Sequence, residues 1–135
     1  MIKLSVSDYS FSAYKKATGA SYEEICRLTK ELGFDGIEFT ALQAEDGERK
    51  ALAQKLKALC DELGLSIFSY TVGANFLADD PEKTVEDMKE AVDIAAILGA
   101  PTMRHDASFS LKNIPGYTWE DGIRDMAPYI REVAE

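Results

Sequence analysis

The sequence predicts an α/β protein in which helices connect the strands of a parallel sheet. Three Leu-Gly pairs carry this prediction, because each ends a helical pattern and is followed closely by a short strand pattern. Their glycines, Gly33, Gly64 and Gly99, readily take the left-handed conformation with which many helices end. The pairs are separated by roughly the 30 residues of one strand–helix–strand step. We expect the order βαβαβαβα in one domain, residues 1–135. An open, doubly wound sheet and part of a closed barrel both fit this order.

The first half of the chain contains clear signals for two strands and the helix between them. A strand is expected at residues 2–7, where apolar residues alternate, followed by a polar and aromatic connection at residues 8–20. Ser21 and the glutamate three residues later form a capping box, so a helix should begin there and end before Gly33. The second strand is expected at residues 36–39.

The second half repeats these signals. Asp46 is suited to cap the next helix, and the third strand is expected at residues 65–70. Pro81 follows an aspartate, a combination that favours the start of a helix. After a short fourth strand and a loop rich in Ser, Asn, Pro and Gly, Thr118 opens the last helix with a second capping pattern. Pro128 lies about ten residues into that helix, so we expect a kink or a break there.

Composition excludes some classes of partner. The chain of 135 residues carries a net charge of −9 and is 46% hydrophobic and 29% charged. An acidic surface repels phosphate backbones and anionic lipid, so we expect neither nucleic acid nor a membrane as a partner. Cys26 and Cys60 lie in predicted helices without metal-type spacing, which favours reduced, structural thiols. No stretch resembles a secretory leader or a membrane span, and we expect a cytoplasmic protein.

Chemistry-bearing residues follow the predicted strands. In parallel α/β proteins, ligands bind at the C-terminal ends of the strands, whether the sheet is open or closed. That edge should gather a carboxylate, an imidazole, a guanidinium, an amide and a phenol, a set that suits a polyhydroxylated or phosphorylated small molecule. The candidate binding residues are Tyr9, Glu38, Asn75, Arg104 and His105.

Each candidate also has a structural interpretation. Glu38 lies on a strand that should be buried, where a carboxylate needs a partner or a ligand. His105 could simply be hydrogen-bonded at the start of a loop, and Arg104 could pair with Glu38 or with the aspartate that follows His105. Asn75 is a common turn residue. Tyr9 could pack on the rim rather than bind a sugar.

Several motifs that would indicate another chemistry are missing from the sequence. It contains neither a dinucleotide-binding G-x-G-x-x-G after the first strand nor a phosphate-binding G-x-x-x-x-G-K-[ST]. A G-x-S-x-G nucleophile elbow is also missing, and no His/Cys cluster forms a complete metal site. We therefore assign no catalytic residue and no metal ligand.

The chain resembles the N-terminal half of the sugar phosphate isomerase/epimerase family, the xylose isomerase-like TIM barrels. The resemblance rests on the stretches at residues 4–11, 31–38, 63–67 and 95–101, followed by Arg104. It implies a parallel (β/α)4 half of a TIM barrel whose substrate-facing edge includes Glu38, Arg104 and His105, with Asn75 and Tyr9 less closely matched. Family members bind a divalent metal such as Mn, Mg, Co or Zn through later strands, so the resemblance implies no metal ligand on this chain.

The function implied by the resemblance is metal-dependent aldose–ketose isomerisation or epimerisation of a sugar or sugar phosphate. In that reaction a carboxylate removes a carbon-bound proton beside a metal-polarised carbonyl. Two alternatives stay open: a dehydratase-like relative that acts on polyols, and a non-catalytic, self-associating α/β module that binds small ligands. Four parallel strands cannot close a barrel, so we also expect the chain to form a homo-oligomer through its open edges.

Overall fold

The computed structural model describes residues 2–45 and 47–135. Its described strands form one four-stranded sheet in the order β1-β2-β3-β4. The strands are β1 (Ser5–Ser7), β2 (Gly36–Thr40), β3 (Ser66–Val72) and β4 (Met103–His105). β2 pairs in parallel with both β1 and β3. Each new strand is added on the same side of the last, without the reversal of direction that marks a doubly wound sheet. Sequential order of this kind is that of a barrel.

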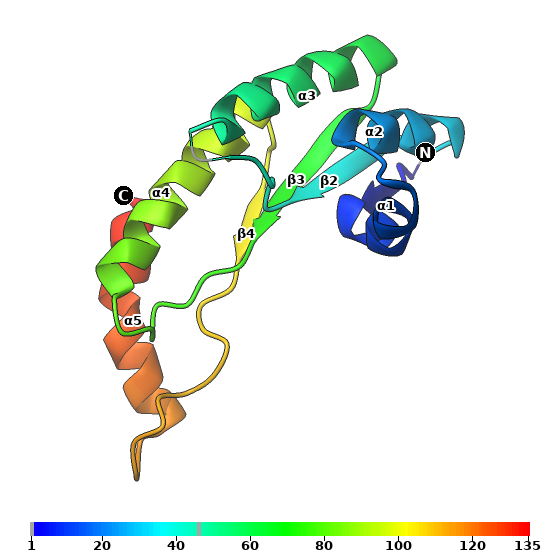
Figure 1. The fold of residues 1–135 in the computed structure, drawn as a ribbon. Helices are drawn as coiled ribbons and strands as arrows, with labels where there is room; N and C mark the ends of the chain where they lie inside the picture. The colour runs from blue at the N-terminus through cyan, green and yellow to red at the C-terminus, as the bar shows by residue number, and fades with distance from the viewer. Residues whose placement is uncertain (1, 46) are drawn as a thin grey trace. The chain divides into compact units, whose positions relative to one another are not determined.

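The chain divides into two compact units. Unit 1 consists of Met1–Thr71 and Asp93–Arg104, and unit 2 of Val72–Val92 and His105–Glu135. Unit 1 holds most of the strands together with α1 (Ser12–Thr18), α2 (Tyr22–Glu31) and α3 (Arg49–Leu63). Unit 2 holds the first part of α4 (Pro81–Leu98) and all of α5 (Trp119–Ala134). Figure 1 traces these elements along the chain.

The core of unit 1 lies between β2 and its helices. α2 packs against both β2 and α3, and β2 and β3 run side by side (Figure 1). The side chains of Ile37 and Phe39 are completely buried, whereas Glu38 and Thr40, which alternate with them on β2, are only half-buried. Because successive side chains of a strand point to opposite faces, one face of β2 is apolar and packed and the other is polar.

The first twenty residues differ from the sequence prediction. β1 is shorter than the strand expected at residues 2–7, and Ile2 and Leu4 are exposed. The expected connection at residues 8–20 contains a 3₁₀-helix, η1 (Asp8–Phe11), followed by α1, which ends at Gly19 with a positive φ. α1 buries none of its side chains. It therefore lacks the apolar stripe by which a helix is recognised in a sequence.

Most helix boundaries follow the local signals. Ser21 Oγ accepts from Glu24 N at 3.2 Å while Glu24 Oε2 accepts from Ser21 N at 2.7 Å, so the capping box of α2 is confirmed. The predicted left-handed helix ends are also confirmed at three glycines, Gly33, Gly64 and Gly99. The cap predicted at Asp46 lies outside the described residues.

The helix starts predicted for unit 2 are confirmed as well. Asp80 Oδ1 accepts from Lys83 N at 3.0 Å at the start of α4, and Thr118 forms a capping box with Asp121 at the start of α5. α5 continues through Pro128, so the helix does not break there, and the alternative of a kink stays a prediction. Pro128 and Arg124, the residue four positions before it, are both exposed. Water can therefore hydrate the carbonyl that loses its donor at the proline.

None of the helices within residues 2–45 and 47–135 is long and apolar enough to cross a membrane.

Candidate functional site

The polar face of the sheet in unit 1 presents two rows of side chains near the C-terminal ends of the strands. Glu38 of β2 lies opposite Ser7 of β1 and Ser69 of β3, and Thr40 lies opposite Thr71. Residues that pair across parallel strands point to the same face, so Ser7, Glu38 and Ser69 form the first row. Thr40 and Thr71 begin a second row two residues further along.

Arg104 extends the second row. Tyr70 N donates to Thr102 O at 3.1 Å. In a parallel ladder this bond places Tyr70 opposite the residue after Thr102 and, one step on, Thr71 opposite Arg104. The second row is therefore Thr40, Thr71 and Arg104, and the Arg104 side chain is exposed. Glu38 and Arg104 thus lie on one face of the sheet, with β3 between them. Their role in binding stays a prediction.

Asp8 fixes one end of the second row. Only 3% of Asp8 is exposed, and its Oδ1 accepts from Thr40 N at 2.8 Å and from Thr40 Oγ1 at 2.7 Å. Lys15 Nζ lies 4.0 Å from Asp8 Oδ2 and 3.9 Å from the centre of the Tyr22 ring. A carboxylate directly after a strand is visible in the sequence, but a partner 32 residues away is not.

Tyr22 supports the same edge from α2. Its hydroxyl oxygen accepts from Gln43 N at 2.9 Å, in the loop after β2. Burial raises the pKa of Tyr22 above its ordinary value of 10.0 and outweighs the opposing effect of this hydrogen bond. The phenol is therefore neutral at physiological pH. It acts as a fixed dipole that holds the loop in place.

Thr71 carries a buried hydroxyl without a hydrogen-bond partner. The residue is 8% exposed, and its Oγ1 is one of two enclosed side-chain polar atoms without a partner among the described residues; the other belongs to Thr29 of α2. Leaving a buried hydroxyl unpaired costs about 1–3 kcal/mol, so such groups normally bind water or a ligand. Thr71 lies between Thr40 and Arg104 in the second row.

Tyr9 belongs to the same unit but is not part of either row. It lies in η1, directly after Asp8, and its side chain is largely exposed. Its backbone N–H donates to Ser7 Oγ at 3.4 Å, which caps the 3₁₀-helix. The ring is free of core packing, and the binding role of Tyr9 stays a prediction.

His105 and Asn75 belong to unit 2. His105 Nδ1 donates to the carbonyl of Asp106 at 2.7 Å, so Nε2 is left as an acceptor, and its ring meets Phe76 edge to face at 5.7 Å. Asn75 Oδ1 accepts from Leu77 N at 3.2 Å and from a serine hydroxyl, that of residue 108, at 3.0 Å. The first bond lies within the loop, as in a turn, and the second joins this loop to the loop after β4.

Neighbouring residues of β4 do not share a face. Arg104 and His105 are consecutive in the strand, and consecutive side chains point to opposite faces. The two side chains therefore cannot act side by side in the Thr40–Thr71–Arg104 row. The sequence prediction grouped them because it used only their place at the end of a strand.

The residues that the structure describes do not fit a metal ion. No group of three or more His, Cys, Asp or Glu side chains among them is arranged to hold one. Glu38 is a member of the first row, whereas Asp8 follows β1 and accepts a hydrogen bond from Thr40 of the second row. No step of a reaction is therefore assigned to a metal on this chain.

Residues 26–135 match the family model described as a xylose isomerase-like TIM barrel. Three solved structures share the fold. The probable 3-DHS dehydratase of petrobactin synthesis from Bacillus anthracis has a TM-score of 0.70 and 22% identity, with 98% of this chain and 47% of that chain covered. L-ribulose 3-epimerase has a TM-score of 0.63 and 19% identity, with 99% and 46% covered. 3-Keto-D-glucoside 4-epimerase from E. coli has a TM-score of 0.61 and 20% identity, with 83% and 46% covered.

At these identities the likeness concerns the fold. The chain spans about half the length of each of the three structures, 46% or 47%. The predicted half of a TIM barrel is thereby confirmed. None of the curated proteins gives a significant match.

Proposed function

The chain belongs to the xylose isomerase-like TIM barrel family, and we propose that it is the N-terminal half of a sugar or sugar phosphate isomerase or epimerase. The observation that carries the proposal is the polar face of the sheet, where Glu38 and Arg104 share a face with the partnerless hydroxyl of Thr71. Barrel interiors are usually filled by layers of branched apolar side chains. Polar rows at this position are better explained by a hydroxyl-rich ligand.

Each residue of the rows has a role in binding such a ligand. The Glu38 carboxylate accepts hydrogen bonds from sugar hydroxyls, and the Arg104 guanidinium donates to hydroxyl or phosphate oxygens. Thr71 Oγ1 donates to a sugar oxygen and thereby gains the partner that it lacks. Tyr9, Asn75 and His105 lie outside the two rows and remain proposed binding residues.

Catalysis is proposed for the whole protein rather than for this half. A divalent metal, Mn, Mg, Co or Zn, would polarise the oxygens of the substrate in the family reaction. Because the described residues do not fit such an ion, we assign neither a ligand nor a proton-transferring group to them. The half described here binds and orients the substrate.

Two alternatives are kept. A dehydratase-like reaction on a polyol is supported by the likeness in fold to the probable 3-DHS dehydratase. A non-catalytic module that associates with itself is supported by the open edges of β1 and β4, the outer strands of the sheet. We propose self-association of the isolated chain on that ground, and light scattering tests it.

Binding of a panel of sugars, polyols and sugar phosphates, measured by calorimetry, tests the proposal. Glu38→Gln should weaken binding about 10- to 100-fold, the equivalent of one hydrogen bond to a charged group. Arg104→Ala should weaken binding of the phosphorylated ligands more than that of the neutral ones. Glu62→Gln, an exposed glutamate of α3, is the matched control and should leave affinity unchanged.

Two outcomes would contradict the proposal. Equal affinities of the wild type, Glu38→Gln and Arg104→Ala for the ligands would show that the polar rows are not part of the binding site. Metal-dependent turnover by the 135-residue chain would show that the half is catalytic by itself. A preference for cyclic polyols over sugars would favour the dehydratase alternative.

A further inference from the structure

Two thiols lie side by side in the core of unit 1. Cys26 of α2 is 0% exposed and Cys60 of α3 is 1% exposed, and both are free. Their sulfur atoms are 3.9 Å apart, within the range of a thiol hydrogen bond. They are the two cysteines of the chain, and α2 and α3 pack against each other. The proposed sugar site uses neither of them.

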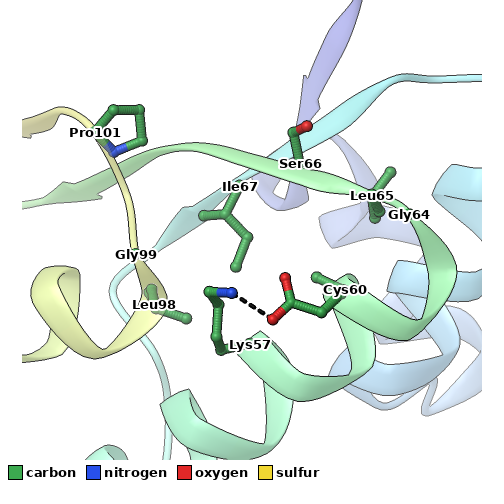
Figure 2. A pocket seen from close by; sticks show the side chains of 10 residues that line it. Lys57, Cys60, Gly64, Leu65, Ser66, Ile67, Leu98, Gly99 and Pro101 are labelled. Atoms are coloured by element: carbon green, nitrogen blue, oxygen red, sulfur yellow. Dashed lines mark hydrogen bonds and ion pairs between the residues drawn. The ribbon is translucent and has the colours of Figure 1, made fainter.

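Cys60 also borders a cavity, and Cys26 does not. The cavity has a volume of about 500 Å³ and is formed where α3 ends, β3 begins and α4 turns toward β4. Lys57 and Ile67 line it together with Cys60, and Figure 2 shows the Lys57 side chain lying next to that of Ile67. The dashed line in Figure 2 is the ion pair of Lys57 with Asp61. Cys60 is therefore the member of the pair that belongs to the cavity wall.

The two thiols are not equivalent chemically. The hydrogen bond between them lowers the pKa of Cys60, whereas burial and the Asp61 carboxylate oppose this effect, and the Lys57 ammonium makes the smallest contribution in its favour. The same hydrogen bond and burial raise the pKa of Cys26. Since thiolates and not thiols are nucleophiles, Cys60 is the member that reacts first.

We propose that Cys26 and Cys60 form an oxidation site for small hydroperoxides, in which Cys60 is the attacking thiolate and Cys26 the resolving thiol. The Cys60 sulfur attacks a peroxide oxygen and breaks the O–O bond, which gives a sulfenic acid and, after protonation, one water from hydrogen peroxide. Cys26 then attacks the sulfenic sulfur, and a second water leaves. Two thiols lose two electrons, and the peroxide is reduced to two waters.

The product is a disulfide that joins α2 to α3. The sulfur atoms must approach from 3.9 Å to about 2.05 Å, a change that side-chain rotation and a small shift of the two helices can supply. The bridge would close a loop between residues that are 34 positions apart and would connect the first two strand–helix units of the sheet covalently.

Treatment of the native chain with hydrogen peroxide tests the proposal. Titratable thiols should fall from two to none, and the mass should fall by two hydrogen atoms, with no covalent dimer on a non-reducing gel. Dithiothreitol should restore both thiols. Cys26→Ala should stop at a sulfenic acid on Cys60, which dimedone labels, and Cys60→Ala should leave Cys26 unmodified. Circular dichroism confirms that each variant is folded.

Three results would overturn it. The first is that both thiols remain titratable in the native chain under conditions that oxidise the urea-unfolded chain. The second is that the disulfides link different chains rather than residues of one chain. The third is that Cys26 in the Cys60→Ala variant reacts with hydrogen peroxide as fast as Cys60 does in the Cys26→Ala variant. If either variant fails to fold, peptide mapping of the oxidised wild type decides, because only an internal Cys26–Cys60 peptide supports the proposal.

Discussion

Replacement of Asp8 by alanine should destabilise unit 1, because one buried carboxylate joins the end of β1 to the end of β2. Asp8 Oδ1 accepts two hydrogen bonds from Thr40, one from the backbone N–H at 2.8 Å and one from the hydroxyl at 2.7 Å. Alanine leaves both donors without this acceptor. It also leaves Lys15, 4.0 Å from Oδ2, without its carboxylate.

The cost can be estimated from these contacts. A hydrogen bond to a charged group contributes about 1.5–3 kcal/mol, and the long ion pair with the partly exposed Lys15 adds no more than about 1 kcal/mol. Thr40 is half-buried, so water recovers part of the loss. Removal of the buried charge also relieves its desolvation cost. We therefore expect Asp8→Ala to lower the free energy of unfolding by about 3 kcal/mol. Asp8→Asn keeps a neutral oxygen for Thr40 and should lose about 1 kcal/mol.

Urea unfolding followed by circular dichroism measures these differences. Thr40→Val removes the hydroxyl donor and keeps the backbone N–H, so the cycle of Asp8→Ala and Thr40→Val should give a coupling of about 1 kcal/mol. A loss of less than about 0.5 kcal/mol in Asp8→Ala would show that the carboxylate does not hold the strands together. Equal losses in Asp8→Ala and Asp8→Asn would assign the effect to charge rather than to the acceptor oxygen.

Three further changes have predictable signs. Gly36→Ala should destabilise by about 1–3 kcal/mol in urea unfolding, because a Cβ at this buried position would overlap the ring of Phe68. Pro128→Ala should stabilise by about 1–3 kcal/mol in thermal unfolding, because it restores a donor inside α5; an unchanged midpoint would contradict this. Hydrogen bonds from a tyrosine and from Lys112 lower the pKa of Asp125 below its ordinary 3.8. Its contribution is therefore present above pH 3.8 and lost as pH falls through the lowered pKa, so the deficit of Asp125→Asn at pH 7 should vanish in acid; a deficit that persists there would refute it.

Local signals account for the parts of the fold that the sequence predicts well. A capping box needs only residues three positions apart, and Ser21 with Glu24 form one as predicted. A left-handed helix end needs only a glycine in the right place, as at Gly33 and Gly64. The parallel order of the strands follows from the alternation of such elements, because a helix between two strands brings the chain back in the same direction.

Features that depend on distant residues could not be predicted in the same way. Asp8 and Thr40 are 32 positions apart, and their hydrogen bonds become visible only once β1 and β2 are paired. The two cysteines are likewise brought together only by the packing of α2 on α3. α1 escaped prediction for a different reason: it buries no side chain, so the sequence pattern has no apolar stripe to reveal it.

The grouping of the candidate site residues also depended on structure that the sequence does not reveal. The rule that ligands bind at the C-terminal ends of parallel strands selected Glu38, Arg104 and His105 as a group. The rule does not say to which face of the sheet each side chain points. The register and the alternation of β4 place Arg104 with Thr40 and Thr71 and turn His105 to the opposite face.

The polar side chains of the two rows stabilise the folded sheet less than apolar side chains would at a packed face. A sheet face that only packs against other side chains is stabilised by apolar residues, and burying a carboxylate or a hydroxyl there without a partner is unfavourable. Glu38 of β2 and Thr71 of β3 lie on the same polar face of the sheet. Under the proposed function, a hydroxyl-rich ligand on this face would supply hydrogen bonds to such side chains and offset that cost.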